Sequence, residues 1–303
     1  MNFSKKSISY LCALISVVFW GMSFVSTKAV MMDLSPLEAT GFRFGIAAVF
    51  LFLLIFTTGS RLRIKIIHLP IYLALSSIGI TIHQLIQASS LLTIDASDAG
   101  WLVSLSPIFT AVISYLFLKE QLSFSKMIGI FIAVCGVLCL TVQKRAGFQM
   151  EIGFLLMILS TLNWAVYSIL LKKFKLPYSV LTSTFYITLF GFLFTLPLLI
   201  KASTLEHFEQ MTLESLLHLL FLGIFVSAAA YYCWGKALES LTAIEVSVFL
   251  YLEPAATVAA AFILLGEHPH PKSAIGGLFI LLGVVLVNGH SLFFSEGAPN
   301  RKK

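Results

Sequence analysis

An internal duplication constrains the fold of this chain more strongly than any other feature of its sequence. A shift of 147 residues aligns the later parts of the two halves, pairing Pro107 with Pro254, Glu120 with Glu267, Gly129 with Gly276 and Gly136 with Gly283. A shift of 144 residues aligns the earlier parts, pairing Ser16 with Ser160, Trp20 with Trp164, Gly21 with Ala165 and Lys28 with Lys172. Each half holds about five apolar segments. An odd number of membrane crossings per unit would give the two units opposite orientations.

The composition places these apolar segments in a lipid bilayer. Hydrophobic residues make up 58% of the 303 residues and charged residues only 11%, which is too few charges to cover a soluble domain of this size. The basic residues behind the net charge of +6 occur in short clusters between apolar runs, as membrane topology requires, so no nucleic-acid partner is expected. We therefore predict an all-α polytopic membrane protein with ten transmembrane helices arranged as two inverted five-helix repeats, an arrangement typical of transporters.

Ten candidate spans follow, each of roughly 18–24 residues and long enough to cross about 30 Å of hydrocarbon. They cover residues 8–29, 37–58, 70–92, 97–118, 126–143, 151–171, 178–200, 215–238, 243–265 and 273–292. Residues 1–146 form the first expected repeat, residues 147–295 the second, and residues 296–303 a short basic cytoplasmic tail. Lys5 and Lys6 before the first span also suit a signal peptide. No small-residue cleavage site follows them, so we expect a retained helix.

The distribution of lysine and arginine predicts that both termini are cytoplasmic. With the N-terminus inside, the inner segments hold Lys5, Lys6, Arg61, Arg63, Lys65, Lys119, Lys126, Lys172, Lys173, Lys175, Arg301, Lys302 and Lys303. The outer segments hold only Lys144, Arg145, Lys201 and Lys272. This ratio of 13 to 4 follows the positive-inside rule and places the acidic loop 202–214 outside. We expect a multi-pass protein of the cytoplasmic (inner) membrane.

Each half contains short motifs that carry a resemblance to a known family. The second half contains Tyr231–Leu238, Leu252–Pro254, Leu265–Glu267 and Gly276–Val284, and the first half contains Phe19–Gly21, Arg43–Phe44, Ser106–Pro107 and Leu118–Glu120. Together they resemble EamA-type carriers of the drug/metabolite transporter superfamily, over nearly the whole chain. The resemblance implies a ten-helix, five-plus-five inverted fold around a central cavity, lined by the first four helices of each repeat. It does not identify the substrate, because relatives move amino acids, nucleotide-linked metabolites and drugs.

Arg43 is a candidate substrate-binding residue because of its depth in the membrane. It lies about six residues inside the span 37–58, where a central charge costs roughly 2.5–3.5 kcal/mol on insertion scales. The side chain must therefore face protein or water. The functional interpretation is an anchor for an anionic or zwitterionic group, since guanidinium offers a planar fork of donors. The alternative is a structural ion pair between this helix and a neighbour.

Two carboxylates lie eight residues apart in the ninth predicted span, Glu245 and Glu253, and share one helix face. Glu253 precedes Pro254, where a helix loses a backbone hydrogen bond and can bend. A deep carboxylate suits reversible protonation during transport, so Glu253 is a proton-coupling candidate. The alternative is a structural role at the kink. Glu245, nearer the cytoplasmic face, is expected to be solvated. The first half has Ser106 at the position of Glu253, so no symmetric pair of carboxylates is expected.

The third predicted span carries a polar stripe at helical spacing, formed by Ser76, Ile80, His83, Gln84 and Gln87. Such a stripe in an apolar helix indicates a face turned to the interior of the bundle. His83 is a candidate for titration near neutral pH, with a hydrogen-bonded packing histidine as the alternative. The two glutamines are candidates for binding a polar solute, with hydrogen bonding between helices as their alternative.

Several aromatic residues fall near span centres, where the aromatic belts of membrane interfaces are not expected. The candidates for cavity walls are Trp20, Trp101, Trp164, Tyr167, Tyr231 and Trp234, with Asn163 one helical turn from Tyr167. Aromatic rings beside a few polar groups are typical of small-molecule pockets. Trp20 and Trp164 occupy equivalent positions in the two halves and are expected on opposing walls. Core packing is the alternative for each ring.

The sequence contains no recognisable catalytic or metal-binding constellation. It has no Gly-rich phosphate loop, His-Glu-x-x-His run or nucleophile elbow. His268 and His270, in a predicted outer loop, lack a partner set. The four cysteines lie within apolar runs and are interpreted as packing thiols. No enzyme activity, cofactor or bound metal is predicted.

The leading hypothesis is a secondary transporter that exports a small organic metabolite, amino acid-like or drug-like, by alternating access. Its expected partners are the solute, the lipid bilayer and, where transport is coupled, protons. An uptake carrier of the same fold is the first alternative. A membrane-embedded enzyme is the second, but it would need a cluster of catalytic carboxylates or histidines at one face. A channel or sensor would favour a polar lumen or a soluble signalling domain.

The predicted topology can be tested by labelling single cysteines placed at Ser125 and Ser203, which lie in different predicted loops. We expect the two thiols to react with an impermeant reagent from opposite sides of the membrane. Reaction of both positions from the same side would contradict the inverted arrangement.

Overall fold

The computed structural model describes residues 5–118, 124–141, 151–174, 176–200, 202–241, 243–266 and 271–293. These residues form helices joined by brief connections, and no β-strand occurs within these ranges. Some residues considered above lie outside the described part, namely Glu120, Glu267, His268, His270, the tail 296–303 and the side chain of Glu245.

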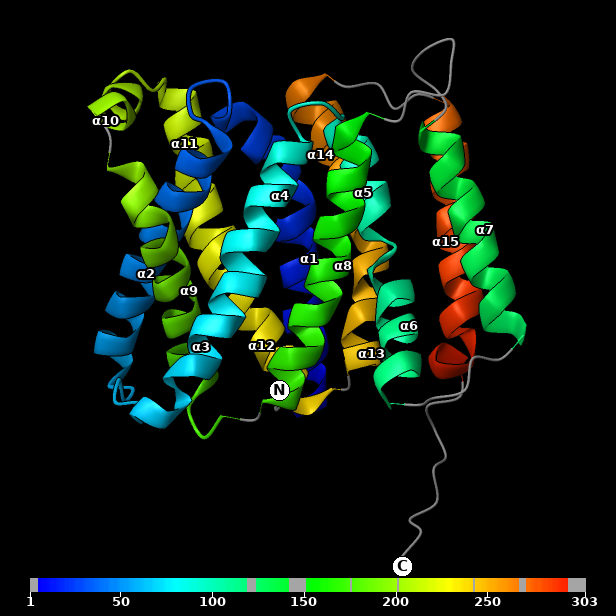
Figure 1. Ribbon diagram of the computed structural model, residues 1–303, viewed down its shortest axis with the longest axis horizontal. Helices are drawn as coiled ribbons and strands as arrows, with labels where there is room; N and C mark the ends of the chain where they lie inside the picture. Colours follow the sequence, from blue (N-terminus) through cyan, green and yellow to red (C-terminus); the bar gives the residue numbers. More distant parts are fainter. Residues whose placement is uncertain are drawn as a thin grey trace, which may run out of the picture.

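Both halves consist of long helices with short irregular segments (Figure 1). The first half contains α1 (Lys5–Val30), α2 (Pro36–Thr58), η1 (Ile66–His68), α3 (Leu69–Ser76), η2 (Ser77–Ile82), α4 (His83–Ser90), α5 (Ala96–Val103), α6 (Ser106–Leu118) and α7 (Phe124–Thr141). The second half contains α8 (Ile152–Lys173), α9 (Val180–Leu199), α10 (Ala202–Glu209), α11 (Leu213–Phe221), η3 (Leu222–Ala230), α12 (Tyr231–Ser240), α13 (Ala243–Ser247), η4 (Val248–Leu252), α14 (Glu253–Leu265) and α15 (Pro271–Phe293). Segments η2 and η3 are π-helical, whereas η1 and η4 are 3₁₀ helices.

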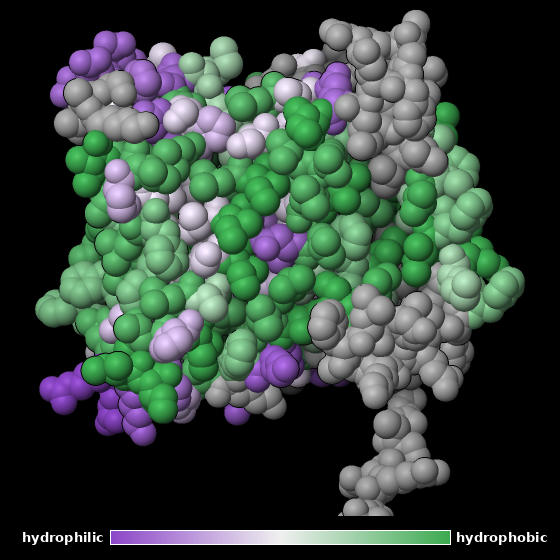
Figure 2. All heavy atoms as spheres, viewed as in Figure 1, coloured by the Kyte–Doolittle hydropathy of each residue, from purple (hydrophilic) through white to green (hydrophobic). Residues whose placement is uncertain are grey.

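The apolar helices coincide with the predicted spans. Seven helical stretches among the described residues are long and apolar enough to cross a membrane: Lys5–Val30, Pro36–Thr58, Ile66–Ser90, Ala96–Ile113, Ile152–Lys173, Val180–Leu199 and Leu213–Ser240. Three shorter apolar helices, Met127–Gly136, Phe249–Leu264 and Ala274–Gly283, fall within the other three predicted spans. The face shown in Figure 2 has a broad hydrophobic band, with hydrophilic residues gathered near α10 at one end and at the opposite end. The prediction of an all-helical polytopic membrane protein is confirmed.

The long helices of the two halves pack in exchanged pairs. α1 packs on α14 and α8 packs on α6, while α1 also packs on α12 and α8 on α4. α2 packs on α9 at the left of Figure 1. α7 packs on α15 at the right. The sequence shifts make α1 equivalent to α8, α4 to α12 and α6 to α14. Each contact therefore occurs twice, with the roles of the two halves exchanged.

Side-chain contacts repeat in the same reciprocal way. The hydroxyl of Ser16 donates to the carbonyl oxygen of Ala230 at 2.8 Å. Its equivalent, Ser160, donates to the carbonyl oxygen of His83 at 3.4 Å, and a shift of 147 residues aligns His83 with Ala230. The same small residue therefore performs the same task on each side of the molecule.

Two spans are interrupted at equivalent places, directly before the aligned prolines. α6 begins at Ser106 before Pro107, and α14 begins at Glu253 before Pro254. Proline suits the first turn of a helix because it lacks the N–H that would otherwise have no partner there. The π segments also correspond, since a shift of 147 residues carries η2 onto residues within η3. Irregular backbone at membrane depth is tolerated only where protein or a cavity surrounds it, so these breaks indicate where a site lies.

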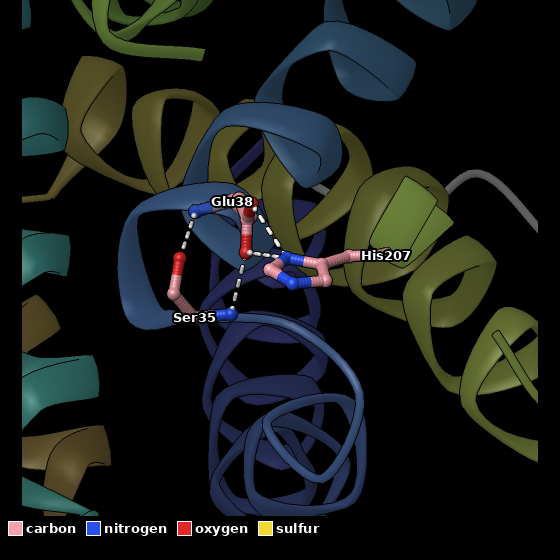
Figure 3. A network of polar contacts seen from close by, with 3 residues as sticks. All are labelled: Ser35, Glu38 and His207. Carbon is pink, nitrogen blue, oxygen red and sulfur yellow. Dashed lines mark hydrogen bonds and ion pairs between the residues drawn. The ribbon is translucent and has the colours of Figure 1, made fainter. Parts of the chain in front are cut away.

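The end of the molecule that carries α10 is joined to α2 by a polar cluster (Figure 3). The backbone N–H of Ser35 donates to Glu38 Oε2 at 2.8 Å, and the N–H of Glu38 donates to Ser35 Oγ at 3.3 Å, which makes a capping box for α2. His207 Nδ1 of α10 lies 3.1 Å from Glu38 Oε1. In the preceding connection, hydrogen bonds from Ser215 and Thr212 lower the pKa of Asp33. These contacts tie the short helix of the second half to the first half.

The contact between α7 and α15 depends on glycine. A Cβ atom at Gly136 would lie 2.6 Å from the carbonyl oxygen of Gly276, and one at Gly283 would clash in the equivalent way with Gly129. We expect Gly136→Val to lower the free energy of unfolding by about 1–3 kcal/mol, because the backbones must separate. Thermal unfolding in detergent measures this change. Val134→Leu is the control, because Val134 is half exposed on the same helix. Equal stability of the two variants would contradict the close contact.

Candidate functional site

A small polar pocket lies at the centre of the molecule, where the two halves meet. It is lined by Trp20, Ser23, Phe24, Arg43, His83, Gln84, Gln87, Val103, Thr161, Trp164, Tyr231, Leu250 and Glu253. Val103 lies beside the break before α6, and Leu250 and Glu253 lie beside the break before α14. Irregular backbone at this depth is tolerated where it borders a cavity. The pocket measures about 30 Å³, which holds about one water molecule. An organic solute therefore requires the walls to move apart.

Arg43 lies at the start of a hydrogen-bonded chain across this pocket. Its Nε donates to Ser227 Oγ at 2.8 Å and its Nη1 donates to Gln84 Oε1 at 3.1 Å. Gln84 Nε2 then donates to the hydroxyl of Tyr231 at 3.1 Å. This hydroxyl in turn donates to the carbonyl oxygen of Gly79 at 3.3 Å. The partners of the guanidinium are neutral, and among the described residues no carboxylate forms an ion pair with it. A buried charge without a counter-charge favours binding of an anionic group.

Glu253 lines the same pocket and is only 3% exposed. Its Oε2 is buried and has no hydrogen-bond partner among the residues that the structure describes. A buried polar atom without a partner costs about 1–3 kcal/mol, so an unpaired carboxylate oxygen indicates a place for a ligand group or a proton. The backbone carbonyl of Glu253 accepts a hydrogen bond from Thr257 Oγ1 at 2.9 Å, one turn further along α14.

His83 is held by its own set of bonds at the edge of the pocket. Its Nδ1 lies 3.0 Å from Ser160 Oγ and 3.1 Å from the Ser160 carbonyl oxygen. The imidazole also packs on the indole of Trp164, with 5.0 Å between ring centroids. These contacts match the alternative of a hydrogen-bonded packing histidine that also forms part of the wall. Gln87 lines the pocket from the next turn of α4.

The two equivalent tryptophans touch each other. The ring centroids of Trp20 and Trp164 lie 4.9 Å apart at an interplanar angle of 79°, and Trp234 packs on Trp20, also at 4.9 Å. The sequence predicts the two indoles on opposing walls of a cavity. Both line the pocket, but they lie in direct contact. The reason is geometric, since equivalent residues near the line that relates the two halves approach each other directly. Edge-to-face contacts of this kind stabilise a closed core.

Four of the predicted binding residues do not line the central pocket. Trp101 packs against Gly277 of α15, where an added Cβ would clash with the indole. Asn163 Nδ2 donates to the carbonyl oxygen of Ile78 in η2 at 2.6 Å, and Trp234 lies behind the other two indoles. Tyr167 packs on Trp164 with 5.1 Å between centroids and lines a neighbouring pocket instead.

Five lining residues were not predicted from the sequence, namely Ser23, Phe24, Val103, Thr161 and Leu250. Ser23 and Phe24 lie one helical turn from Trp20, and Thr161 lies one turn from Trp164, so this spacing was a usable signal. Val103 and Leu250 are unremarkable in sequence, because the helix that faces them decides whether an apolar residue meets a cavity.

A second pocket, which we call the vestibule, adjoins the central one. It measures about 320 Å³ and is lined by Tyr167, Leu171, Lys172, Phe174, Leu176, Tyr178, Val180, Ser183, Thr184, Ile187, Tyr231, Gly235, Leu238 and Glu239. Lys172 Nζ caps the end of α12 by donating to the carbonyl oxygens of Leu241, at 2.8 Å, and Leu238. Its equivalent, Lys28, lies 3.6 Å from Asp95 Oδ1 after α4. Each lysine therefore binds residues at or just after the end of the equivalent helix of its own half.

Comparisons with known proteins agree with this architecture. A model of the EamA-like transporter family matches residues 7–142 and again residues 151–289. The chain belongs to the EamA-like transporter family. The resemblance seen in the sequence is thus confirmed, and the apolar helices and the family together identify a multi-pass membrane transporter.

Individual relatives of this EamA-like transporter span almost the same length. An uncharacterized transporter of Archaeoglobus fulgidus is 30% identical over 273 residues, covering 90% of this chain and 96% of the relative. A probable terminal-alkyne amino-acid exporter of Streptantibioticus cattleyicolor is 24% identical over 288 residues, covering 95% of this chain and 96% of the relative. A solved crystal structure with 20% identity has a TM-score of 0.67 and covers 97% of this chain and 100% of that one, so the two share a fold.

The tryptophan pair of this EamA-like transporter can be tested by conservative substitution. We expect Trp20→Phe or Trp164→Phe to weaken solute binding by about tenfold, or about 1.4 kcal/mol, because both indoles line the pocket. The melting temperature in detergent should change little, since a phenyl ring fills most of the space. Trp101→Phe is the matched control, because Trp101 lies outside the pocket lining. A fall in stability without a selective loss of transport would favour core packing alone.

Proposed function

We propose that this protein is a secondary carrier that exports a small zwitterionic metabolite, amino acid-like in its charged groups, by alternating access. The observation that carries the proposal is the meeting of Arg43 and Glu253 in one small pocket, each 3% exposed. Arg43 offers a fork of donors to a carboxylate, and Glu253 offers an acceptor with an unsatisfied oxygen to an ammonium group. The tryptophans supply an apolar wall for the rest of the solute.

The carrier would have ten membrane-crossing helices in two inverted repeats, with both termini cytoplasmic. The exchanged helix pairs and reciprocal side-chain contacts support this arrangement. So does the charge distribution, because the outer and inner loops differ in lysine and arginine as topology requires. Inverted repeats provide two alternative packings related by exchange of the halves, and such exchange underlies alternating access.

Proton coupling would follow from competition at Glu253. A deep carboxylate can hold either a proton or the ammonium group of a solute, but not both at full strength. Arrival of a proton from outside would release the solute there, and arrival of the solute from inside would release the proton. Export driven by a proton gradient then needs no second titratable site in the pocket.

Export is favoured over uptake by one relative, which is named a probable terminal-alkyne amino-acid exporter. The name also supports a solute with amino-acid charges. An uptake carrier of the same fold remains the competing proposal, since the same pocket would serve both directions. A membrane-embedded enzyme has less support, because the family that contains the chain is one of transporters.

The function can be tested in inside-out membrane vesicles that contain the protein. A panel of radiolabelled L-amino acids is added under an imposed proton gradient, acidic inside, and accumulation is compared with vesicles that lack the protein. Export in the cell corresponds to accumulation in these vesicles. Absence of accumulation for every amino acid, together with transport of non-zwitterionic solutes, would contradict the proposed substrate class.

The role of Glu253 gives a specific prediction. Glu253→Gln keeps the shape of the side chain and mimics its protonated form, so it should flatten the pH profile of net transport and abolish accumulation against a gradient. Exchange of solute across the membrane can survive, because exchange does not require release of the proton. Both quantities are measured in proteoliposomes over a range of pH.

The matched control is Glu214→Gln, because Glu214 is exposed in the first turn of α11 and lines neither pocket. It should leave the pH profile unchanged. A wild-type pH profile in Glu253→Gln, with accumulation retained, would leave Glu253 as a structural hydrogen-bonding group at the kink.

A further inference from the structure

The central pocket is nearly closed, whereas the vestibule beside it has about ten times its volume, at 320 Å³ against 30 Å³. The vestibule lies between α8, α9 and α12, at the end where the connection from α8 to α9 is predicted to be cytoplasmic. Among the described residues, Tyr231 alone lines both pockets. Its ring is therefore the partition between a space that a solute can enter and the space that contains Arg43 and Glu253.

The hydroxyl of Tyr231 holds this partition in place. It accepts a hydrogen bond from Gln84 Nε2 at 3.1 Å and donates to the carbonyl oxygen of Gly79 at 3.3 Å. Gln84 in turn accepts from Arg43. A carboxylate that binds Arg43 competes with Gln84 for the guanidinium, and loss of that contact frees the amide that binds Tyr231. The position of the ring is thus linked to the occupancy of Arg43.

Tyr231 lies beside both of the described π segments. It is the first residue of α12, directly after the π segment η3, and Gly79 belongs to the π segment η2. π segments have less regular hydrogen bonding than the α-helix. On the vestibule side, Gly235 lies one turn further along α12, where an added Cβ would be 2.7 Å from Val180 Cγ1. The glycine lets α12 pack closely on Val180 of α9 at the wall of the vestibule, so a larger side chain there would crowd the path.

We propose that the vestibule is the cytoplasmic access path for the solute and that Tyr231 is its gate, held shut by hydrogen bonds to Gln84 and Gly79. The proposal rests on the proposed function, in that it assigns an entry route to the same central site. The path suits a small amphipathic zwitterion, because its walls combine apolar side chains with the hydroxyl of Ser183, the ammonium of Lys172 and the carboxylate of Glu239.

The gate can be tested by thiol accessibility, without any transport measurement. Two matched serine-to-cysteine variants are made in a background whose four native cysteines are alanine. Ser183→Cys places a thiol in the vestibule and Ser23→Cys places one in the central pocket. The probe is 2-sulfonatoethyl methanethiosulfonate, a small impermeant anion, added to inside-out vesicles. Each thiol is tested in three backgrounds, namely with Tyr231 unchanged, with Tyr231→Phe and with Tyr167→Phe. The last is the control, because it removes a hydroxyl from the vestibule wall only.

We expect Ser183→Cys to react at a similar rate in all three backgrounds. Ser23→Cys should react slowly with Tyr231 present and at least about tenfold faster in Tyr231→Phe, because the phenyl ring lacks the hydrogen bonds that hold it. The control Tyr167→Phe should not accelerate it. Gly235→Leu added to Tyr231→Phe should block the central reaction again by filling the path. Size-exclusion profiles establish that each variant is folded, and if the Gly235 variant is not, the Tyr231→Phe comparison decides.

Equal rates for Ser23→Cys with Tyr231 and with Tyr231→Phe would overturn the gate. An unreactive Ser183→Cys in inside-out vesicles would overturn the access path. These outcomes are separate from failure of the proposed function. Accelerated labelling together with no transport of any amino acid would keep the gate and reject the substrate class, whereas amino-acid transport with unchanged labelling would do the reverse.

Discussion

The hydrogen bond between Gln84 and Tyr231 lies where the two halves of the molecule meet, and the organisation of the centre depends on it. The two residues are 147 positions apart, which is the shift that aligns the later parts of the halves, so each is the counterpart of the other. A bilayer offers no partners to polar groups. The guanidinium of Arg43 and the carbonyl of Gly79 must therefore be satisfied within the protein, and both are bound through this pair.

The same need for partners within the protein applies to the breaks in the helices. A π segment leaves carbonyl groups without their usual helical partners. Two such carbonyls, of Ile78 and Gly79, accept bonds from side chains of the other half, Asn163 and Tyr231. The second half thus completes the irregular backbone of the first, and Ser16 of the first half binds the carbonyl oxygen of Ala230 in η3 in return. A movement of one half against the other would change these bonds, which connects helix geometry to the opening and closing of the central pocket.

The scaffold is reciprocal, but the chemistry of the site is not. Ser16 and Ser160 make the same bond on both sides. The second half has Glu253 where the first has Ser106, so the pocket has one carboxylate opposite one guanidinium rather than two identical charges. Such asymmetry suits a solute with two different ends. In the proposed alternating access, the symmetric part would provide two related conformations, and the asymmetric part would provide a defined orientation for the bound solute.

The sequence by itself determined the helical class, the positions of the apolar segments and the equivalence of the two halves, because hydropathy and spacing act locally along the chain. It also singled out Arg43 and Glu253, since charges at such depth are costly wherever the helix faces. Only the tertiary structure decided that Trp20 and Trp164 touch, and that Tyr231 divides a closed pocket from an open one. Those facts depend on how helices distant in sequence are rotated and paired, and periodicity within one helix carries no information about its neighbour.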